Sequence, residues 1–163
     1  MKQAFLEGVN QLVLKEVPKP EIERPDQILV RIRAVTICGA DVHMLHGCHP
    51  PNQGKYPSAI GHEGAGIVEA VGDWVTDTSA SLSTSFKPGD RVATKEWFNG
   101  CMAEYTLTTA DNLLHIPDEM PFEQAAVLEP LHATYPLAYQ CFQLGETVVI
   151  IGQGSVGLLF TQT

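Results

Sequence analysis

A run of β-branched residues that leads directly into spaced glycines is the feature that most constrains how this chain folds. The segment Glu146–Ile151 is typical of a buried strand, and Gly152, Gly154 and Gly157 follow it at once. The apolar residues that come next are typical of a helix that begins within the glycine group. A strand, a tight turn and a helix open a βαβ unit, so residues 145–163 are expected to begin a parallel-sheet domain that the chain leaves truncated.

Each glycine in this turn has a physical task if the turn binds a dinucleotide. Gly152 allows the tight turn, Gly154 lets backbone N–H groups approach a pyrophosphate, and Gly157 lets the helix pack closely on the strand. The helix N-terminus then attracts the anion. An ordinary glycine-rich loop is the alternative, but the predicted strand before the glycines and the helix after them favour an NAD or NADP site. The acidic residue that distinguishes the two cofactors would lie beyond Thr163, so both stay open.

The chain before this turn is punctuated by glycine and proline and is mainly β. Side chains from Ile28 to Val35 alternate with a period of two, which indicates a strand with one buried face. Several short strands joined by tight turns predict a barrel or a sandwich. The expected strands are Gln3–Leu6, Gln11–Glu16, Ile28–Val35, Ala65–Val71, Arg91–Thr94, Ala103–Leu107 and Leu113–Ile116. The first two flank a turn at Glu7–Asn10 and are expected to form a hairpin.

The pattern changes to helical near Pro117. Two helices are expected there, over Phe122–Val127 and Leu131–Phe142. The chain therefore divides into three parts, which are a β domain at 1–128, a connecting helix at 129–144 and the opening of a second domain at 145–163.

The composition limits the partners of this chain. Ten Lys and Arg residues stand against nineteen Asp and Glu residues, which gives a net charge of −9 and leaves no basic footprint for nucleic acid or an anionic membrane. No apolar run approaches the roughly 20 residues that span a bilayer. Four cysteines in 163 residues are too few for a secreted disulfide scaffold, so a cytoplasmic protein with free or metal-binding thiols is expected.

Three separated segments carry residue types that bind zinc. Cys38, His62 and Glu129 offer a thiolate, an imidazole and a carboxylate. A catalytic zinc takes about three such protein ligands and keeps one open position. Taken singly, each residue has an ordinary structural explanation, as a small buried cysteine, a core histidine or an acid at a helix N-terminus. All three residues occur in one chain and precede the glycine turn in the sequence, and together they favour a metal site.

A second group of soft ligands lies in one short segment. His43, His46, Cys48 and His49 are close together in the sequence and could bind an adventitious zinc or copper ion. The two prolines that follow instead favour a tight loop of solvent-exposed polar residues.

Five motifs follow one another along the chain: Cys38–His43, Gly61–Glu63, Lys87–Val92, Glu129–Leu131 and Gly152–Gly157. With these motifs the chain resembles the medium-chain, zinc-dependent alcohol dehydrogenase superfamily, and within it the polyol (sorbitol) and threonine dehydrogenase branch. The resemblance covers nearly all of this chain but only the N-terminal half of a family member. It implies a GroES-like, partly open β-barrel catalytic domain joined to a Rossmann domain. It also implies reversible oxidation of a secondary alcohol or polyol to a ketone, with hydride transfer to NAD or NADP.

The resemblance assigns metal-binding roles to single residues. Cys38 and His62 match two ligands of the catalytic zinc, and Glu63 matches the adjacent glutamate that binds the metal or lies directly behind it. Glu129 matches the remaining ligand position, which holds cysteine in alcohol dehydrogenases and a glutamate, direct or linked through water, in the polyol branch. Asp41 matches the carboxylate that orients the ligand histidine.

His43 matches the outer end of the family's proton relay, and with Asp41 and Glu63 it completes the expected catalytic residues. The family usually has Ser or Thr two residues after the zinc cysteine, where this chain has Ala40, which can neither donate nor accept a proton. The relay to His43 would therefore run through water. Where many relatives carry four cysteines for a structural zinc, this chain has only Cys101, so one catalytic zinc and no structural zinc are expected.

Two functions stay open at this stage. The first is the catalytic-domain part of a zinc-dependent NAD(P) dehydrogenase for a small alcohol or polyol, inactive as the isolated chain because its cofactor site is incomplete. The second is a non-enzymatic metal-binding or interaction β-domain, a degenerate remnant of the family, which Ala40 favours. The apolar strand over 147–151 would lack its sheet, so the C-terminal segment is expected to pack on the barrel or to pair with another copy of the chain as a homo-oligomer.

Overall fold

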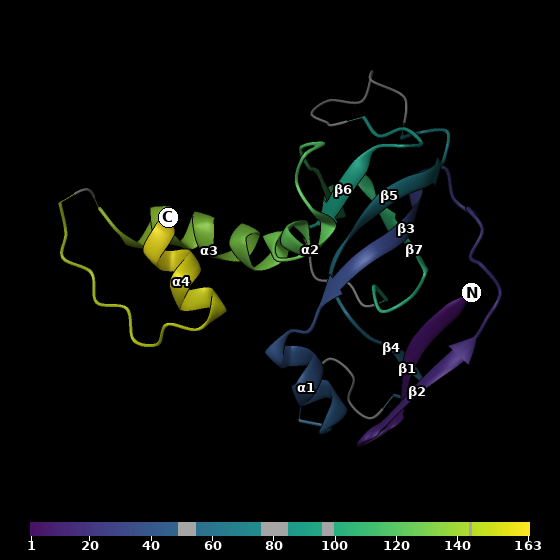
Figure 1. Ribbon diagram of the computed structural model, residues 1–163, viewed down its shortest axis with the longest axis horizontal. Helices are drawn as coiled ribbons and strands as arrows, with labels where there is room; N and C mark the ends of the chain where they lie inside the picture. The colour runs from purple at the N-terminus through teal and green to yellow at the C-terminus, as the bar shows by residue number, and fades with distance from the viewer. Residues whose placement is uncertain (49–54, 76–84, 96–99, 144) are drawn as a thin grey trace.

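The computed structural model describes residues 1–48, 55–75, 85–95, 100–143 and 145–163. Two β-sheets form a body from the N-terminal part of the chain, and α3 (Leu128–Cys141) leads away from that body toward the C-terminal segment (Figure 1). The mainly β character with a few helices confirms the predicted class.

A five-stranded antiparallel sheet with the order β7-β3-β5-β6-β8 forms the centre of the body. The register of β3 and β5 places Thr36, the last residue of β3, opposite Glu63, the first residue of β5. The segment that follows β3 and the segment that precedes β5 therefore meet at one end of the sheet. The strands are β3 (Gln27–Thr36), β5 (Glu63–Val71), β6 (Arg91–Thr94), β7 (Tyr105–Thr109) and β8 (Leu113–His115).

A smaller sheet with the order β2-β1-β4 packs beside the first. β1 (Lys2–Gly8) and β2 (Gln11–Glu16) form the predicted hairpin, which turns at Asn10 with a φ of 59°. β4 (Ser58–Ala59) pairs with β1 and was not predicted, because two residues are too few to show an alternating pattern.

Aliphatic and aromatic side chains of the larger sheet form the main core. Ile28 and Val30 of β3 pack in one cluster with Phe86, and each is at most 2% exposed. Burial of a side chain of this kind contributes about 1.5–3 kcal/mol. β3 and β5 approach so closely at Gly66 that a Cβ there would lie 2.2 Å from the carbonyl oxygen of Arg31. Only glycine fits this position without a shift of the backbone.

Two helices flank the position at which β3 and β5 meet. α1 (Gly39–Leu45) directly follows β3 and was not predicted, since a helix of this length shows too little periodicity to be detected. α2 (Phe122–Ala125) lies within the predicted segment, and a single turn of 3-10 helix, η2 (Ala110–Asn112), joins β7 to β8. α3 begins three residues before its predicted start at Leu131. The helix can include Pro130 because proline is tolerated in a first turn.

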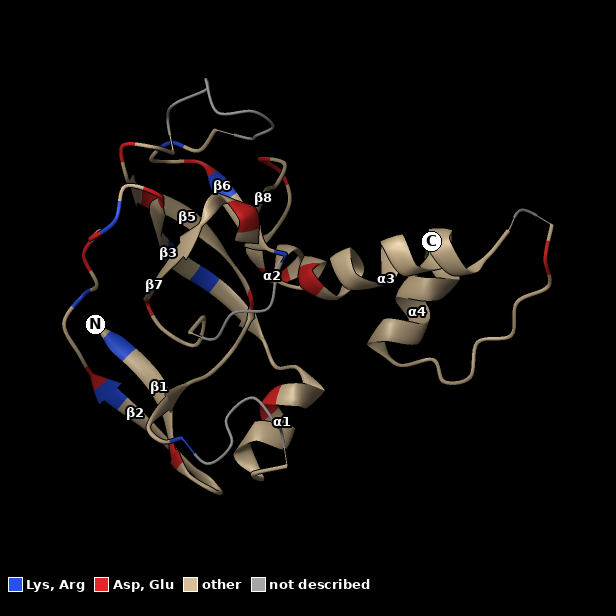
Figure 2. Ribbon diagram, turned by 180° about the vertical axis from the view of Figure 1, so that it is seen from behind, with Lys and Arg blue, Asp and Glu red and all other residues tan. Residues whose placement is uncertain are grey.

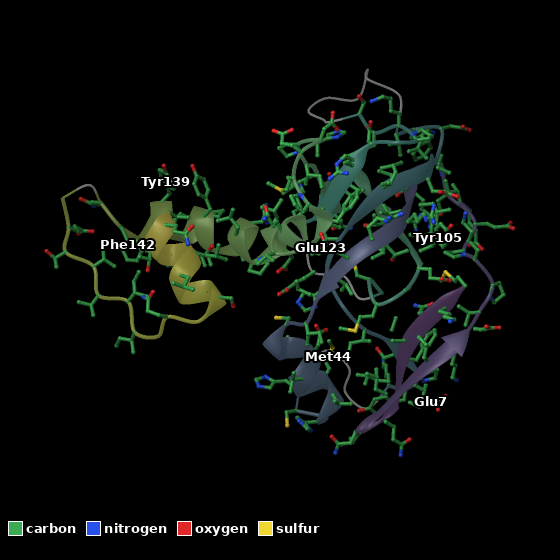
Figure 3. The ribbon with its side chains drawn as sticks, viewed as in Figure 1. Glu7, Met44, Tyr105, Glu123, Tyr139 and Phe142 are labelled. Carbon is green, nitrogen blue, oxygen red and sulfur yellow. The ribbon has the colours of Figure 1, made fainter. Side chains whose placement is uncertain are left out.

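The C-terminal segment lies outside the β body. α4 (Ser155–Gln162) packs beside α3, and Figure 3 shows Tyr139 near the end of α3 and Phe142 directly after it, both remote from the sheets. Residues 145–154 contain no strand, which corrects the strand expected over Glu146–Ile151. A strand needs a neighbour to pair its backbone groups, and no described strand lies beside this segment.

Charged residues are distributed unevenly over the chain. From Leu131 to the C-terminus only Glu146 is charged, and Figure 2 shows the outer part of α3 and all of α4 without Lys, Arg, Asp or Glu. Among the helices that the structure describes, none combines the length and the apolar character needed to cross a bilayer.

Candidate metal centre

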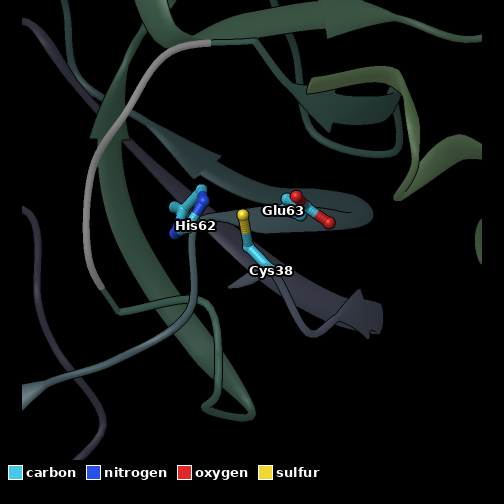
Figure 4. A group of neighbouring side chains, drawn as sticks. All are labelled: Cys38, His62 and Glu63. Atoms are coloured by element: carbon cyan, nitrogen blue, oxygen red, sulfur yellow. The ribbon is translucent and has the colours of Figure 1, made fainter. Parts of the chain in front are cut away.

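Three ligand-type side chains meet where β3 ends and β5 begins. Cys38 lies two residues beyond β3, His62 directly precedes β5, and Glu63 is its first residue. One ligand atom from each side chain lies within 4.8 Å of the other two. His62 and Glu63 are 1% and 5% exposed, and Figure 4 shows the Cys38 sulfur between them. The antiparallel pairing of β3 and β5 thus brings residues that are distant in sequence to one buried point.

A single threonine fixes the backbone on both sides of Glu63. Thr94, at the end of β6 and 2% exposed, donates its hydroxyl to the His62 carbonyl at 2.7 Å and accepts the Gly64 N–H at 2.9 Å. The chain enters this stretch through Gly61, which has a φ of 86°. Glycine adopts this left-handed conformation readily, whereas other residues are strained in it. The backbone that carries the histidine and the glutamate is therefore rigidly placed.

Asp41 joins the two segments that carry the candidate ligands. It is 3% exposed on α1, and its carboxylate accepts the backbone N–H of Cys38 at 2.9 Å and of Gly61 at 3.3 Å. Its Oδ1 atom also lies 3.6 Å from Nδ1 of His62. One buried carboxylate thus contacts the Cys38 turn and the His62 turn together.

The charges around the site favour a cation. Burial is the largest single effect and opposes protonation of the His62 ring, but the surrounding carboxylates, with Asp41 first among them, together outweigh burial and raise the pKa of His62. The carboxylates of Glu129 and Glu63 act on this pKa in the same direction. Burial raises the pKa of the Cys38 thiol, and the neighbouring Glu63 raises it further. Carboxylates that favour a proton on these two ligands also favour a metal ion in its place.

Cys101 lies behind the site and is fully buried. Burial, with the charges of Asp41 and Glu129, raises the pKa of its thiol to about 12. A Cβ on Gly64 would lie 3.0 Å from the Cys101 sulfur, so the thiol packs directly against β5. Cys101 therefore acts as a small apolar side chain, outside the ligand group.

Two other residues that the sequence singled out lie around the group. Glu129 is the second residue of α3, and its charge raises the pKa of His62. It is not one of the three residues whose ligand atoms lie within 4.8 Å of one another. His43 lies exposed on α1. The structure thus brings Glu129 near the site and leaves His43 at the surface.

The rival ligand group is not assembled among the residues that the structure describes. His46 uses its Nδ1 atom for a contact with Asn10 Oδ1 at 2.7 Å, and Cys48 is exposed. His43, His46 and Cys48 form no group of ligand atoms, and His49 lies outside the described residues.

The glycine turn has a compact local geometry. Gly152 has a φ of 98°, and Gly154 immediately precedes the first turn of α4. A Cβ on Gly157 would lie 1.9 Å from the carbonyl oxygen of Gly152, so that only glycine fits. A Cβ on Gly154 would meet no atom within 4 Å, so the backbone of Gly154 is open to an approaching group.

The donor set at the sheet end fits zinc. Thiolate, imidazole and carboxylate are the ligands that zinc takes in proteins, and three protein ligands leave one position open. The buried carboxylates supply the negative charge that a divalent cation neutralises. Two residues that shape the centre, Thr36 and Thr94, were not predicted. Nothing in their spacing marks them, because their contacts with the ligand segments arise from strand pairing.

Comparison with known families places this site in context. The model of the alcohol dehydrogenase GroES-like domain matches residues 24–118, which is more than half of the chain. The chain belongs to the medium-chain zinc alcohol dehydrogenase superfamily. The matched residues include Cys38, His62 and Glu63, and the match confirms the predicted GroES-like fold.

The chain spans about half the length of the curated relatives it matches. D-xylulose reductase A from Aspergillus niger is 30% identical over 175 residues, covering 94% of this chain and 49% of that protein. The structure of galactitol-1-phosphate dehydrogenase from Escherichia coli is 26% identical with a TM-score of 0.80, covering 99% of this chain and 51% of that one. A Sinorhizobium meliloti 1021 structure, assigned to the zinc-binding dehydrogenases and bound to NADP, is 29% identical with a TM-score of 0.78, covering 99% and 52%.

Proposed function

We propose that this chain is the catalytic-domain portion of a zinc-dependent, NAD(P)-linked dehydrogenase that oxidises a secondary alcohol or polyol to a ketone. The observation that carries the proposal is the group of Cys38, His62 and Glu63, with ligand atoms within 4.8 Å of one another and with His62 and Glu63 buried. Membership of the superfamily supports it, because the group lies inside the matched domain. The names of the relatives, D-xylulose reductase and galactitol-1-phosphate dehydrogenase, support a polyol as substrate.

The residues of the chain divide the work of holding the metal. Cys38, His62 and Glu63 would bind zinc and leave one position open, and Glu129 would act on the metal through water. When bound, zinc supplies a Lewis acid that lowers the pKa of a substrate hydroxyl. Asp41 faces Nδ1 of His62 and so presents the other ring nitrogen to the metal, as carboxylates behind ligand histidines do.

The proton path depends on Ala40 and His43. Ala40 has no hydroxyl, so the side chain at this position passes no proton outward. His43 lies exposed on α1, where solvent reaches its ring. Water would carry the proton from the substrate hydroxyl to His43.

The glycine turn would hold the cofactor. Gly152 and Gly157 shape the turn, and the open backbone of Gly154 at the N-terminus of α4 would receive the pyrophosphate of NAD or NADP. The cofactor carries the hydride, and the protein positions it. The segment 147–151 would become the first strand of a Rossmann domain only beside parallel neighbours.

A second function, metal binding without turnover, has two observations in its favour. Ala40 interrupts the proton path, and the segment 147–151 is unpaired in the described structure. On this proposal the chain binds zinc at the same three ligands and transfers no hydride.

Zinc content per chain, measured by elemental mass spectrometry, tests the metal centre. We expect about one zinc in the wild-type chain and nearly complete loss in Cys38→Ser and His62→Ala, because each removes one of the few protein ligands. The exposed cysteines give matched controls, and Cys48→Ser and Cys141→Ser should keep the metal.

The same series separates the alternatives. Zinc that is absent, or indifferent to both ligand variants, would reject the proposed centre. Loss of zinc in Cys48→Ser would move the site to the segment of His43, His46 and Cys48. In a zinc-loaded chain, reduction of NAD or NADP in the presence of sorbitol favours the enzyme over metal binding without turnover.

We further infer the compartment and the assembly of this protein. All four cysteines are free, which suits the reducing cytoplasm. Val149 and Ile151 are 80% and 96% exposed and would be covered if two copies associated through their C-terminal segments as a homo-oligomer. Sedimentation as a monomer at all concentrations would contradict the assembly.

A further inference from the structure

Thr36 contacts the metal centre through its side chain. It is the last residue of β3 and lies directly opposite Glu63 in the register of the sheet. Directly opposed residues of an antiparallel pair carry their side chains on the same face. The Thr36 hydroxyl donates a hydrogen bond to Oε2 of Glu63. The chain then reaches Cys38 within two residues, so one strand end supplies both a ligand and this contact.

A second acceptor lies within reach of the Thr36 hydroxyl, but the hydrogen bond to it is weaker. The carbonyl oxygen of Ala126, directly after α2, lies 3.4 Å from the Thr36 hydroxyl. A hydroxyl has one proton and donates it to one acceptor at a time. Hydrogen bonds to a carboxylate are shorter and stronger than bonds to a neutral carbonyl. The proton of Thr36 therefore goes to Glu63.

Glu63 needs such a donor to stay at the centre. Thr94 fixes its backbone, but the rotatable bonds of the side chain leave the position of the carboxylate undetermined. The bond from Thr36 to Oε2 restricts rotation of the side chain and keeps the carboxylate beside the group.

We propose that Thr36 is a positioning residue of the metal centre. Its hydroxyl holds the Glu63 carboxylate beside Cys38 and His62, in the orientation in which Glu63 serves as a ligand. This inference rests on the metal centre proposed above, and it assigns to this chain a contact that the five sequence motifs do not contain.

The test compares two substitutions of Thr36 in the full chain. Thr36→Val keeps the shape and removes the hydroxyl, whereas Thr36→Ser keeps the hydroxyl. We expect Thr36→Val to weaken zinc binding about 10- to 100-fold in competition with a chelator, the usual effect of removing a partner behind a ligand. Thr36→Ser should bind close to the wild-type affinity. Thr36→Ala removes the hydroxyl in a second way and should match Thr36→Val, so the test stands if one variant folds poorly.

Cobalt absorption spectroscopy reports the ligand geometry, which a general loss of stability would not change. With Co²⁺ in the site, Thr36→Val should shift the d–d bands, which report the ligand geometry, while the thiolate charge-transfer band from Cys38 remains. In the Glu63→Ala background, Thr36→Val should have no further effect on affinity, because its partner is gone.

Thr108→Val is the matched control. Thr108 is 6% exposed on β7, and its hydroxyl has no hydrogen-bond partner among the described residues. This variant should bind zinc and cobalt as the wild type does. Unchanged affinity in Thr36→Val, or an equal loss with and without Glu63, would overturn the role of Thr36 while leaving the metal centre in place. A wild-type chain that binds no metal would instead reject the centre itself, and the role of Thr36 with it.

Discussion

In the β body, Ile28 and Phe86 are 0% and 1% exposed, whereas Val149 and Ile151 in the C-terminal segment are 80% and 96% exposed. The residue types in both places are apolar. The difference lies in their neighbours, because β3 has a paired strand on each side and the segment 147–151 has none among the described strands. Apolar character thus marks a segment as suited to burial, and the available partners decide whether burial occurs.

The two regions also differ in why their backbone requires glycine. In the body, Gly66 is required because another strand approaches it, which depends on the fold of residues distant in sequence. In the C-terminal segment, Gly157 is required because of Gly152, five residues earlier in the same turn. The turn therefore forms without a sheet, since its geometry is local, while its strand does not.

Amide hydrogen exchange should show the largest contrast between the regions. We expect the amides of residues 147–151 to exchange about 1,000-fold faster, or more, than those of Ile67 and Val68 in β5. The central strand opens only with the global unfolding free energy of several kcal/mol, and unpaired amides need no opening. Exchange followed by mass spectrometry after pepsin digestion resolves the two segments.

A second copy of the chain could abolish this contrast. If 147–151 is as protected as β5, and the protection falls on dilution, then the segment pairs between copies and the homo-oligomer is supported. Protection that does not change on dilution would mean that the segment pairs within its own chain, against the arrangement described here.

Two glycine substitutions with similar local crowding should differ in their effect on stability. A new Cβ would lie 2.2 Å from a backbone oxygen at Gly66 and 1.9 Å from one at Gly157. We expect Gly66→Ala to lower the free energy of unfolding of the β body by about 1–3 kcal/mol, as overpacking in a core does. Gly157→Ala should change it by less than about 0.5 kcal/mol, because α4 lies outside the body.

Urea unfolding, followed by the far-ultraviolet signal of the sheets, measures both effects. Gly154→Ala is the control within the turn, since a Cβ there meets no atom within 4 Å and the φ of −77° suits any residue. A loss of more than 1 kcal/mol in Gly157→Ala would show that the two regions unfold together.

The sequence predicted the elements whose signals are local. The alternation around Ile28 and Val30 identified β3, and the hairpin closed at the predicted turn near Asn10. The segment Glu146–Ile151 had an equally clear pattern, but the pattern cannot specify whether a neighbouring strand is present. α1 was missed because seven residues give too few turns for a helical period.

Three of the predicted ligand residues lie together in the structure, whereas two of the residues that contact them were not predicted. Cys38, His62 and Glu63 were identified from residue type and motif, and the structure brings them within 4.8 Å of one another. Thr36 and Thr94 act through contacts that exist only once the strands pair, so no spacing in the sequence marks them. Sequence patterns report which atoms can bind a metal, and strand register decides which atoms hold them in place.

The smallest difference in stability is expected between substitutions of two carboxylates that make equivalent local contacts, one in the β body and one in the C-terminal segment. Asp90 accepts the Lys87 N–H at 2.9 Å, and Glu146 accepts the Gln143 N–H at 2.7 Å, each from three residues earlier. Burial disfavours ionised Asp90, but the Lys87 donors outweigh it and lower the pKa of Asp90 below its usual value of 3.8. A depressed pKa stabilises the fold above the unfolded-state pKa, and this contribution is lost as the pH falls through the folded-state pKa.

We therefore expect Asp90→Asn to lower the free energy of unfolding by about 1 kcal/mol at pH 7, because the amide oxygen of Asn accepts without the charge that strengthens the bonds from Lys87. The difference from wild type should begin to shrink near pH 4 and close at lower pH, where the wild-type carboxyl is also neutral. Glu146→Gln removes the equivalent charge outside the β body and should leave the unfolding of the sheets unchanged at every pH. Urea unfolding at pH 7, 5 and 3 measures all three chains. A difference for Asp90→Asn that stays constant down to pH 3 would assign its effect to packing, because a charge-dependent bond must weaken as the carboxyl takes up its proton.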